Sequence, residues 1–151
     1  MMVLDSKNIT VMMIDDDEIN RQMAEMILTK KLPYRVITVE SGMRGIELMY
    51  QYEVNLVLLD VTMPVWDGFK TLQVMRADER LKDIPVIMLT AAADLGTVVK
   101  AKEYGVQDYI KKPFMPDDLA DRVAKIIWDN WQQQGVGGRP KSSAVKKPLM
   151  E

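Results

Sequence analysis

The sequence predicts an α/β fold in which a five-stranded parallel sheet is covered by helices on both faces, a doubly wound arrangement. Short apolar segments alternate five times with segments that have helical hydrophobic spacing, and this alternation is typical of a parallel sheet. Val54–Leu59 is an almost unbroken apolar run, which indicates a strand buried on both faces. Polar residues follow several of these runs directly, at the sheet edge where open α/β folds bind ligands.

Local signals support each element of the first half of the chain. Asp17 and Ser41 are suitable N-caps for two helices, because short polar side chains accept hydrogen bonds from the free N–H groups of a first turn. Apolar residues recur at helical spacing after Asp17. The elements expected here are strands at Ile9–Asp15, Arg35–Val39 and Val54–Asp60, with helices at Glu18–Lys31 and from Ser41 to about Tyr52.

The second half continues the same alternation. The turn signal Trp66-Asp67-Gly68 precedes the third helix, and Gly105 is placed to end the fourth. Expected here are strands at Ile84–Thr90 and Asp108–Lys111, with helices from about Phe69 to Arg80, from about Asp94 to Tyr104, and from Pro116 or Asp117 to about Gln133.

The 151 residues predict one domain with a segment attached. We expect the domain at residues 1–134 and a flexible basic tail, or the stub of a linker, at residues 135–151, where Gly, Pro and Ser become frequent. The tail has a net charge of +3 and the remainder −5. An acidic body argues against nucleic-acid binding through the domain.

Several function classes are excluded by residues that the chain lacks. It contains no cysteine and no histidine, which removes disulfides, thiolate nucleophiles, Ser-His catalysis and His-ligated metals. No stretch reaches the ~18 apolar residues that a membrane span needs. We therefore expect a cytoplasmic protein without a membrane association.

Five polar residues are expected to meet at the carboxyl ends of the strands: Asp15, Asp16, Asp60, Thr90 and Lys112. Singly, each has a structural explanation, such as helix capping for the first two. Together, converging carboxylates would repel one another unless a divalent cation relieved the repulsion. The hydroxyl and the ammonium group are suitable donors to phosphoryl oxygens, so the set indicates phosphoryl transfer.

The motifs and their spacing resemble those of response regulator receiver domains in two-component signal transduction, and in particular the single-domain chemotaxis receiver. The intervals are 44 residues from Asp16 to Asp60, 30 from Asp60 to Thr90 and 22 from Thr90 to Lys112. The resemblance covers roughly residues 8–132. It implies a flavodoxin-like (βα)5 fold with strand order 2-1-3-4-5.

The resemblance also implies a phosphorelay chemistry. Asp60 would accept a phosphoryl group from a sensor histidine kinase or phosphotransfer protein. Asp15, Asp16, Asp60 and the backbone carbonyl of Thr62 would hold Mg²⁺, with Mn²⁺ as a substitute. Such a domain is not an enzyme in the ordinary sense, since it catalyses only its own phosphorylation and dephosphorylation.

Three further residues receive roles from the resemblance. Lys112 would pair with Asp60 and then with the phosphoryl oxygens, and its bond to Pro113 would be cis. Thr90 would turn toward the phosphoryl group, and Tyr109 would follow it inward. This switch would repack the surface of the fourth helix, fifth strand and fifth helix, for a downstream protein, an output domain outside this sequence or a homodimer.

Two alternatives stay open at this point. A haloacid-dehalogenase-like phosphatase would use Asp15 as its nucleophile, with Asp117 and Asp118 completing the site. A receiver-like interaction module would keep the fold and never be phosphorylated. For the homodimer, Arg122, Asp108 and Glu103 resemble part of a known charged dimer surface, whereas Gln107 stands where an acid is commoner.

Overall fold

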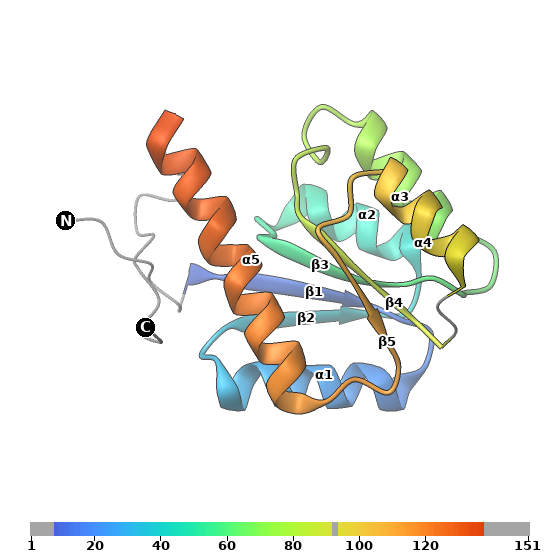
Figure 1. Ribbon diagram of the computed structural model, residues 1–151, viewed down its shortest axis with the longest axis horizontal. Helices are drawn as coiled ribbons and strands as arrows, with labels where there is room; N and C mark the ends of the chain where they lie inside the picture. The colour runs from blue at the N-terminus through green and yellow to red at the C-terminus, as the bar shows by residue number, and fades with distance from the viewer. Residues whose placement is uncertain (1–7, 92–93, 138–151) are drawn as a thin grey trace.

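The computed structural model describes residues 8–91 and 94–137, which form one parallel sheet between two layers of helices (Figure 1). The strand order is β2-β1-β3-β4-β5, and all neighbouring strands are parallel. The flavodoxin-like arrangement predicted from the sequence is therefore confirmed. The strands are β1 (Thr10–Ile14), β2 (Arg35–Val39), β3 (Leu56–Asp60), β4 (Val86–Thr90) and β5 (Asp108–Lys111).

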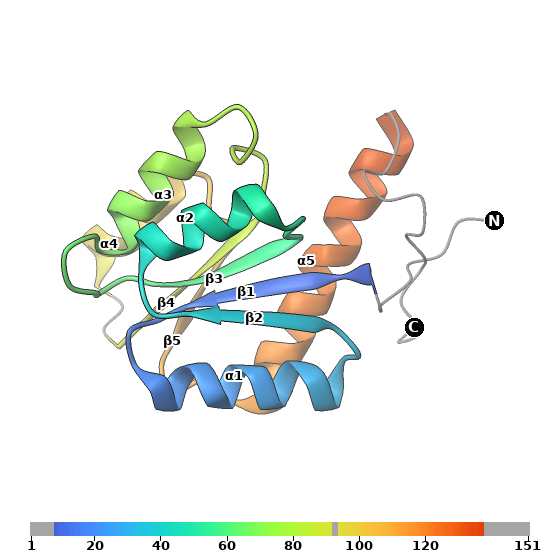
Figure 2. The same cartoon turned by 180° about the vertical axis from the view of Figure 1, so that it is seen from behind.

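The helices divide between the two faces of the sheet, as the views from the front and the back show (Figures 1 and 2). Two of them, α1 and α5, cover one face, and the other three cover the opposite face. Short polar N-caps start four of them, including the predicted Asp17 and Ser41. The helices are α1 (Glu18–Lys31), α2 (Gly42–Gln51), α3 (Gly68–Ala77), α4 (Leu95–Glu103) and α5 (Pro116–Gly137).

Alternation along the central strands supplies both halves of the core. In β1, Val11 and Met13 belong to the cluster under α1 and α5, whereas Met12 and Ile14 belong to the cluster under α2, α3 and α4. All four are fully buried. Because a strand with two buried faces has no polar side, β1, β3 and β4 are apolar except where they end. Those ends are consequently the places where ionisable groups reach the surface.

Two predicted helix ends need correction. The third helix ends at Ala77 and not at Arg80, because Asp78 adopts an extended conformation and its carboxylate accepts a hydrogen bond from the Arg80 N–H at 2.7 Å. The last helix continues past Gln133 to Gly137, into the segment predicted to be the tail. Residues 1–7 and 138–151, the latter most of the predicted tail, lie outside the described residues.

Gly105 ends the segment after α4 in a left-handed conformation with φ 72°, as predicted from its position. No helix among the described residues is long and apolar enough to cross a membrane. The cytoplasmic location stays a prediction.

Candidate functional site

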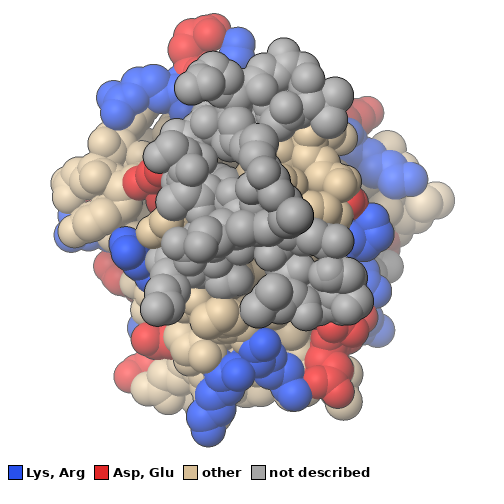
Figure 3. All heavy atoms as spheres, turned by 90° about the vertical axis from the view of Figure 1, so that its left-hand side faces the viewer, with Lys and Arg blue, Asp and Glu red and all other residues tan. Residues whose placement is uncertain are grey.

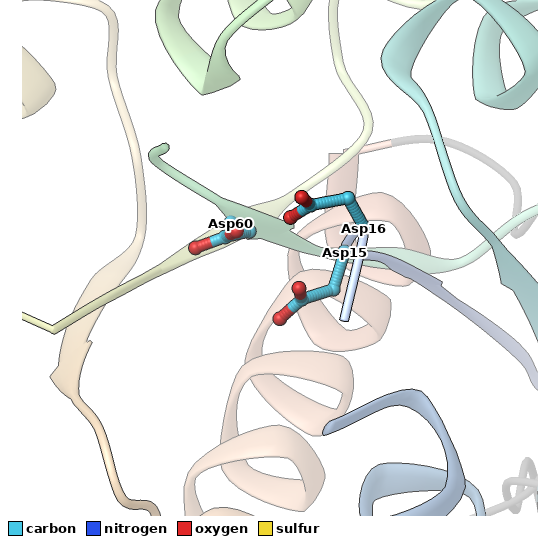
Figure 4. Close-up of side chains that lie close together, drawn as sticks. All are labelled: Asp15, Asp16 and Asp60. Carbon is cyan, nitrogen blue, oxygen red and sulfur yellow. The ribbon is translucent and has the colours of Figure 1, made fainter. Parts of the chain in front are cut away.

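Three carboxylates converge at the carboxyl edge of the sheet, from the ends of the two central strands. Asp15 and Asp16 follow β1, Asp60 is the last residue of β3, and these two strands are neighbours. One carboxylate oxygen from each lies within 4.8 Å of the others (Figure 4). The predicted convergence of the three acids is therefore found.

Lys112 bridges two of the three acids. Its Nζ lies 2.8 Å from Asp15 Oδ2 and 2.9 Å from Asp60 Oδ1. It follows β5, and the Lys112–Pro113 peptide bond is cis, as expected from the resemblance. The contact with Asp15 was not predicted. The ammonium group therefore holds both buried carboxylates in place.

Asp15 is fully buried, and residues of the following loop and of α1 supply it with partners. The Asp17 N–H donates to Asp15 Oδ1 at 2.9 Å, and Arg21 Nη1 donates to the Asp15 backbone oxygen at 2.8 Å. Asp16 is exposed. The site thus contains one enclosed carboxylate, one at the lip and one open to solvent.

Burial dominates the electrostatics of Asp60. Its side chain is 6% exposed, and burial raises the pKa to about 6, with the neighbouring Asp15 and Asp16 charges adding to this and Lys112 opposing it. Burial also lowers the pKa of Lys112, but its hydrogen bonds to Asp15 and Asp60 outweigh burial, so the pKa lies above the ordinary value. A raised pKa means that nearby positive charges and hydrogen-bond donors do not fully offset the cost of burying the ionised carboxylate.

Three carboxylates within 4.8 Å fit a hard divalent cation, because such ions prefer oxygen ligands and relieve repulsion among acids. Of the three, Asp16 is exposed to solvent, whereas Asp60 is buried at the lip of the site and Asp15 is fully buried. Thr62 lies in the loop directly after β3, and the role of its carbonyl stays a prediction.

Thr90 and Tyr109 lie on adjacent strands beside the acids. Thr90 is the buried last residue of β4, and β5 pairs with β4 so that Tyr109 lies opposite Met88. The Tyr109 hydroxyl is buried. Burial raises the pKa of Tyr109, and an interaction with the Thr90 side chain partly offsets this. The two predicted switch residues are therefore neighbours, with the tyrosine ring turned into the protein.

Gly68 allows α3 to approach the end of β3 closely. Its N–H donates to the Val61 oxygen at 2.8 Å, and a Cβ there would lie 2.4 Å from the Asp60 backbone oxygen. Any side chain would push α3 away from the end of β3. The sequence suggested only a turn at this glycine, since the close approach depends on where α3 packs.

The loop between β3 and α3 holds one strained residue, Val65, with φ 67° and 92% of its surface exposed. A left-handed conformation is costly for a β-branched residue. We expect Val65→Gly to raise the free energy of unfolding by about 0.5–1 kcal/mol, since relief of strain exceeds the added entropy of the unfolded chain. Urea denaturation measures this. Val99→Gly, at an exposed position inside α4, is the control and should lower stability, whereas a loss at both positions would contradict the prediction.

The structure does not bring Asp117 and Asp118 to Asp15, as the phosphatase alternative requires. Asp117 and Asp118 lie in the first turn of α5. Asp117 forms an ion pair with Lys31 at 2.7 Å, and Asp118 forms one with Arg122. Neither is among the acids that meet at Asp15. Two of the three charged residues suggested for a dimer form an ion pair within the chain, with Arg122 Nη1 2.9 Å from Asp108 Oδ1. Gln107 accepts a hydrogen bond from the Val86 N–H at 2.8 Å. The dimer stays a prediction.

Comparison with known proteins agrees with this geometry. Residues 11–124 match the response regulator receiver domain family. A probable C4-dicarboxylate response regulator of Priestia megaterium is 40% identical over 116 residues, which are 74% of this chain and 48% of that protein. A probable transcriptional regulator of Guillardia theta is 34% identical over 117 residues, 78% of this chain and 44% of its own length. The chain thus spans less than half the length of these relatives.

Solved structures give the same result. A putative response regulator from Chloroflexus aurantiacus superimposes with a TM-score of 0.75 at 31% identity, covering 80% of this chain and 98% of its own. The receiver domain of a sensor histidine kinase from Pseudomonas aeruginosa has a TM-score of 0.72 at 28% identity, with the same coverage of the two chains, and holds a magnesium ion in its active site cleft. The chain belongs to the response regulator receiver domains, the signalling modules of two-component systems.

Proposed function

We propose that this receiver domain accepts a phosphoryl group on Asp60 from a phosphohistidine of a sensor kinase or phosphotransfer protein. The observation that supports this best is the position of the Asp60 carboxylate, at the lip of a buried strand between a lysine 2.9 Å away and two further acids. In the reaction an Asp60 oxygen forms a bond to phosphorus as the bond from phosphorus to the histidine nitrogen breaks, and the imidazole keeps the electron pair.

Asp15, Asp16 and Asp60 are the residues that would hold Mg²⁺, or Mn²⁺ in its place, with the Thr62 carbonyl as a further ligand. The ion supplies positive charge against the phosphoryl oxygens and the acids. The magnesium in the Pseudomonas aeruginosa receiver domain supports this assignment. The chain's own contribution is a preformed set of oxygens on rigid strand ends, which keeps reorganisation small.

Lys112 then has two tasks. Before transfer it holds Asp60 Oδ1 at 2.9 Å and Asp15 Oδ2 at 2.8 Å. After transfer, a third proton of its ammonium group is available for a phosphoryl oxygen, because an ammonium donates three hydrogen bonds. Thr90 donates its hydroxyl to the same group from the end of β4. Lys112 and Thr90 thereby offset the negative charge of the phosphoryl oxygens, which water would otherwise have to solvate.

The output is a change at the surface formed by α4, β5 and α5. Movement of Thr90 toward the phosphoryl group changes the surroundings of the buried Tyr109 hydroxyl, and phosphorylation thereby biases a packed element between two arrangements. The recipient is a downstream protein or an output domain, since the relatives that this chain matches are about twice as long.

The test is incubation with Mg²⁺ and acetyl phosphate, followed by intact-protein mass spectrometry. We expect one added phosphoryl group on the unaltered chain, none on Asp60→Asn, and none after chelation of the metal. Asp83→Asn, at an exposed acid remote from the cluster, is the matched control and should be phosphorylated normally. Phosphorylation that survives Asp60→Asn would refute the assignment. A phosphoryl group found on Asp15 of the unaltered chain, and absent from Asp15→Asn, would favour a phosphatase. No phosphorylation of the folded, metal-loaded chain would indicate an interaction module.

A further inference from the structure

Asp16 lies in the short loop that joins β1 to α1, and it is the exposed member of the three acids. An exposed side chain on a loop ordinarily samples several directions, and fixing it in one of them costs conformational entropy. Its carboxylate nevertheless lies with those of Asp15 and Asp60, with one oxygen of each within 4.8 Å of the others (Figure 4). The contacts that hold the loop therefore decide how well this oxygen set is preorganised.

The residue before Asp16 is bound at each of its polar atoms. The Asp15 N–H donates to the Val39 oxygen at 3.1 Å. The two Asp15 carboxylate oxygens accept from the Asp17 N–H at 2.9 Å and from Lys112 Nζ at 2.8 Å. The backbone oxygen of Asp15 accepts from Arg21 Nη1 at 2.8 Å. This last contact comes from a side chain of α1 to which phosphoryl transfer gives no other task.

Arg21 binds the backbone oxygens on both sides of Asp16. Its own N–H donates to the Asp17 oxygen at 3.1 Å, a first-turn helix bond that any residue except proline would make. Its guanidinium group donates to the Asp15 oxygen, which requires a long side chain with a donor at its end. The Asp15 carbonyl and the Asp16 N–H belong to one planar peptide unit. By fixing that unit, Arg21 limits the directions in which the Asp16 side chain can point.

Charge alone would disfavour an arginine at this place. The guanidinium group stands next to a residue of the candidate cation site, and charges of the same sign repel. Loss of the Arg21 charge should therefore strengthen the binding of a divalent cation. Loss of a contact that aims Asp16 should weaken it. Because the two effects have opposite signs, a single affinity measurement separates them.

We propose that Arg21 is a positioning residue that holds the Asp15–Asp16 peptide so that the Asp16 carboxylate is directed at a divalent cation beside Asp60, an inference that rests on the proposed function. Arg21 itself touches neither the ion nor the phosphoryl group. Replacing a residue that orients a metal ligand typically changes metal affinity by roughly 10- to 100-fold. The effect of Arg21 should lie at the lower end, because its guanidinium group acts on the backbone beside a ligand and not on the ligand carboxylate.

Titration with Mg²⁺, followed by the amide NMR shifts of Asp16, Val61 and Thr62, tests this without a phosphodonor. We expect Arg21→Met to raise the dissociation constant about 10-fold. Arg21→Lys keeps a positive charge and a donor on a long stem, and it should restore part of the affinity. Unchanged or tighter binding by Arg21→Met would overturn the proposal, since tighter binding is what loss of the charge alone predicts.

Two control variants separate positioning from charge and from stability. Arg44→Met removes the same charge from the first turn of α2, where the guanidinium group binds Glu47 at 3.0 Å, and its Mg²⁺ affinity should not fall. Arg76→Met removes contacts at the amino end of the sheet, including that with the Ile84 oxygen ahead of β4. Figure 3 views the molecule from that end, where charged side chains of both signs lie around the margin. A loss of affinity in Arg76→Met equal to that in Arg21→Met would reduce the effect to general destabilisation and overturn the proposal.

A measurement on the unaltered chain decides the matter even when a variant does not fold. Without metal, the heteronuclear NOE of the Asp16 amide should be as high as those inside α1, because Arg21 holds the loop before any ion binds. Ordering of Asp16 only after addition of Mg²⁺ would overturn the proposal. A parent chain whose acid-loop amides do not respond to Mg²⁺ would refute the cation site of the proposed function, and the role of Arg21 with it. A responding parent with an equally responsive Arg21→Met would refute the positioning role alone.

Discussion

Asp60→Asn is expected to raise the free energy of unfolding by about 2 kcal/mol at pH 7 in the presence of a chelator, since each pKa unit corresponds to 1.36 kcal/mol. Burial raises the pKa of Asp60 to about 6 from 3.8, so an ionised Asp60 is less stable in the folded chain than in the unfolded one. The lost hydrogen bond from Lys112 makes the gain smaller than the full shift would give. Urea denaturation of both proteins measures the difference.

The pH dependence of this difference follows from the sign of the shift. A raised pKa in the folded state means that Asp60 favours folding when protonated, below about pH 4. This contribution is lost as the pH rises through about 6. The advantage of Asp60→Asn should therefore be absent near pH 3.5, grow between pH 4 and 6, and be complete at pH 7. A difference in the free energy of unfolding that stays constant with pH would contradict the prediction that the ionised Asp60 carboxylate destabilises the folded chain. A variant less stable than the parent at pH 7 would also contradict it.

Addition of Mg²⁺ provides a control with the same two proteins, the parent and Asp60→Asn. Mg²⁺ should stabilise the parent more than the variant, because a ligand that binds only the folded state adds stability in proportion to its affinity. Asp83→Asn, at an exposed acid that forms no ion pair within the described residues, should stay within about 0.5 kcal/mol of the parent under all these conditions.

Arg76→Met is expected to lower the free energy of unfolding by about 3 kcal/mol, because charged donors contribute ~1.5–3 kcal/mol per hydrogen bond and do not add fully. The Arg76 guanidinium donates to four backbone oxygens: Tyr104 at 2.8 Å, Lys82 at 2.9 Å, Ile84 at 3.0 Å and Gly105 at 3.3 Å. Burial lowers its pKa, and Asp83 partly opposes this. One side chain thus joins α3 to the end of α4.

Arg80→Met is the control for this prediction, since Arg80 lies four residues further on and contacts mainly the Tyr50 ring. It should cost below about 1 kcal/mol. Hydrogen exchange adds a local readout, with faster exchange around Tyr104 and Gly105 expected in Arg76→Met alone. Similar losses in both variants would mean that the carbonyl contacts of Arg76 contribute little.

Much of the fold could be predicted because the central strands are buried on both faces. An apolar run that ends abruptly in Asp15, Asp60 or Thr90 identifies both a strand and its carboxyl end. The convergence of the acids then follows from parallel pairing, since the carboxyl ends of parallel strands meet at one edge. The intervals between these residues identified the family more specifically than any single motif did.

The features that could not be predicted depend on side chains that meet across the packed structure. The bridge from Lys112 to Asp15 depends on the path of the chain after β5. The four oxygens bound by Arg76 come from segments that only tertiary packing brings together. Val65 adopts a left-handed conformation although nothing in its residue type favours one, because the β3–α3 loop must reach a glycine that packs against β3. In the first two cases the contacts join residues far apart in the chain, which no local pattern specifies.

The three tryptophans give this molecule two separate optical probes. Trp66 lies in the loop next to the acids, with Lys70 Nζ 5.6 Å from its ring, whereas Trp128 and Trp131 stack at the far end of α5. Emission that changes when the acid cluster binds an ion should therefore come from Trp66 and not from the stacked pair. Comparison of the unaltered chain with Trp66→Phe separates the two contributions, so that an event at one end of the sheet can be distinguished from an event at the other.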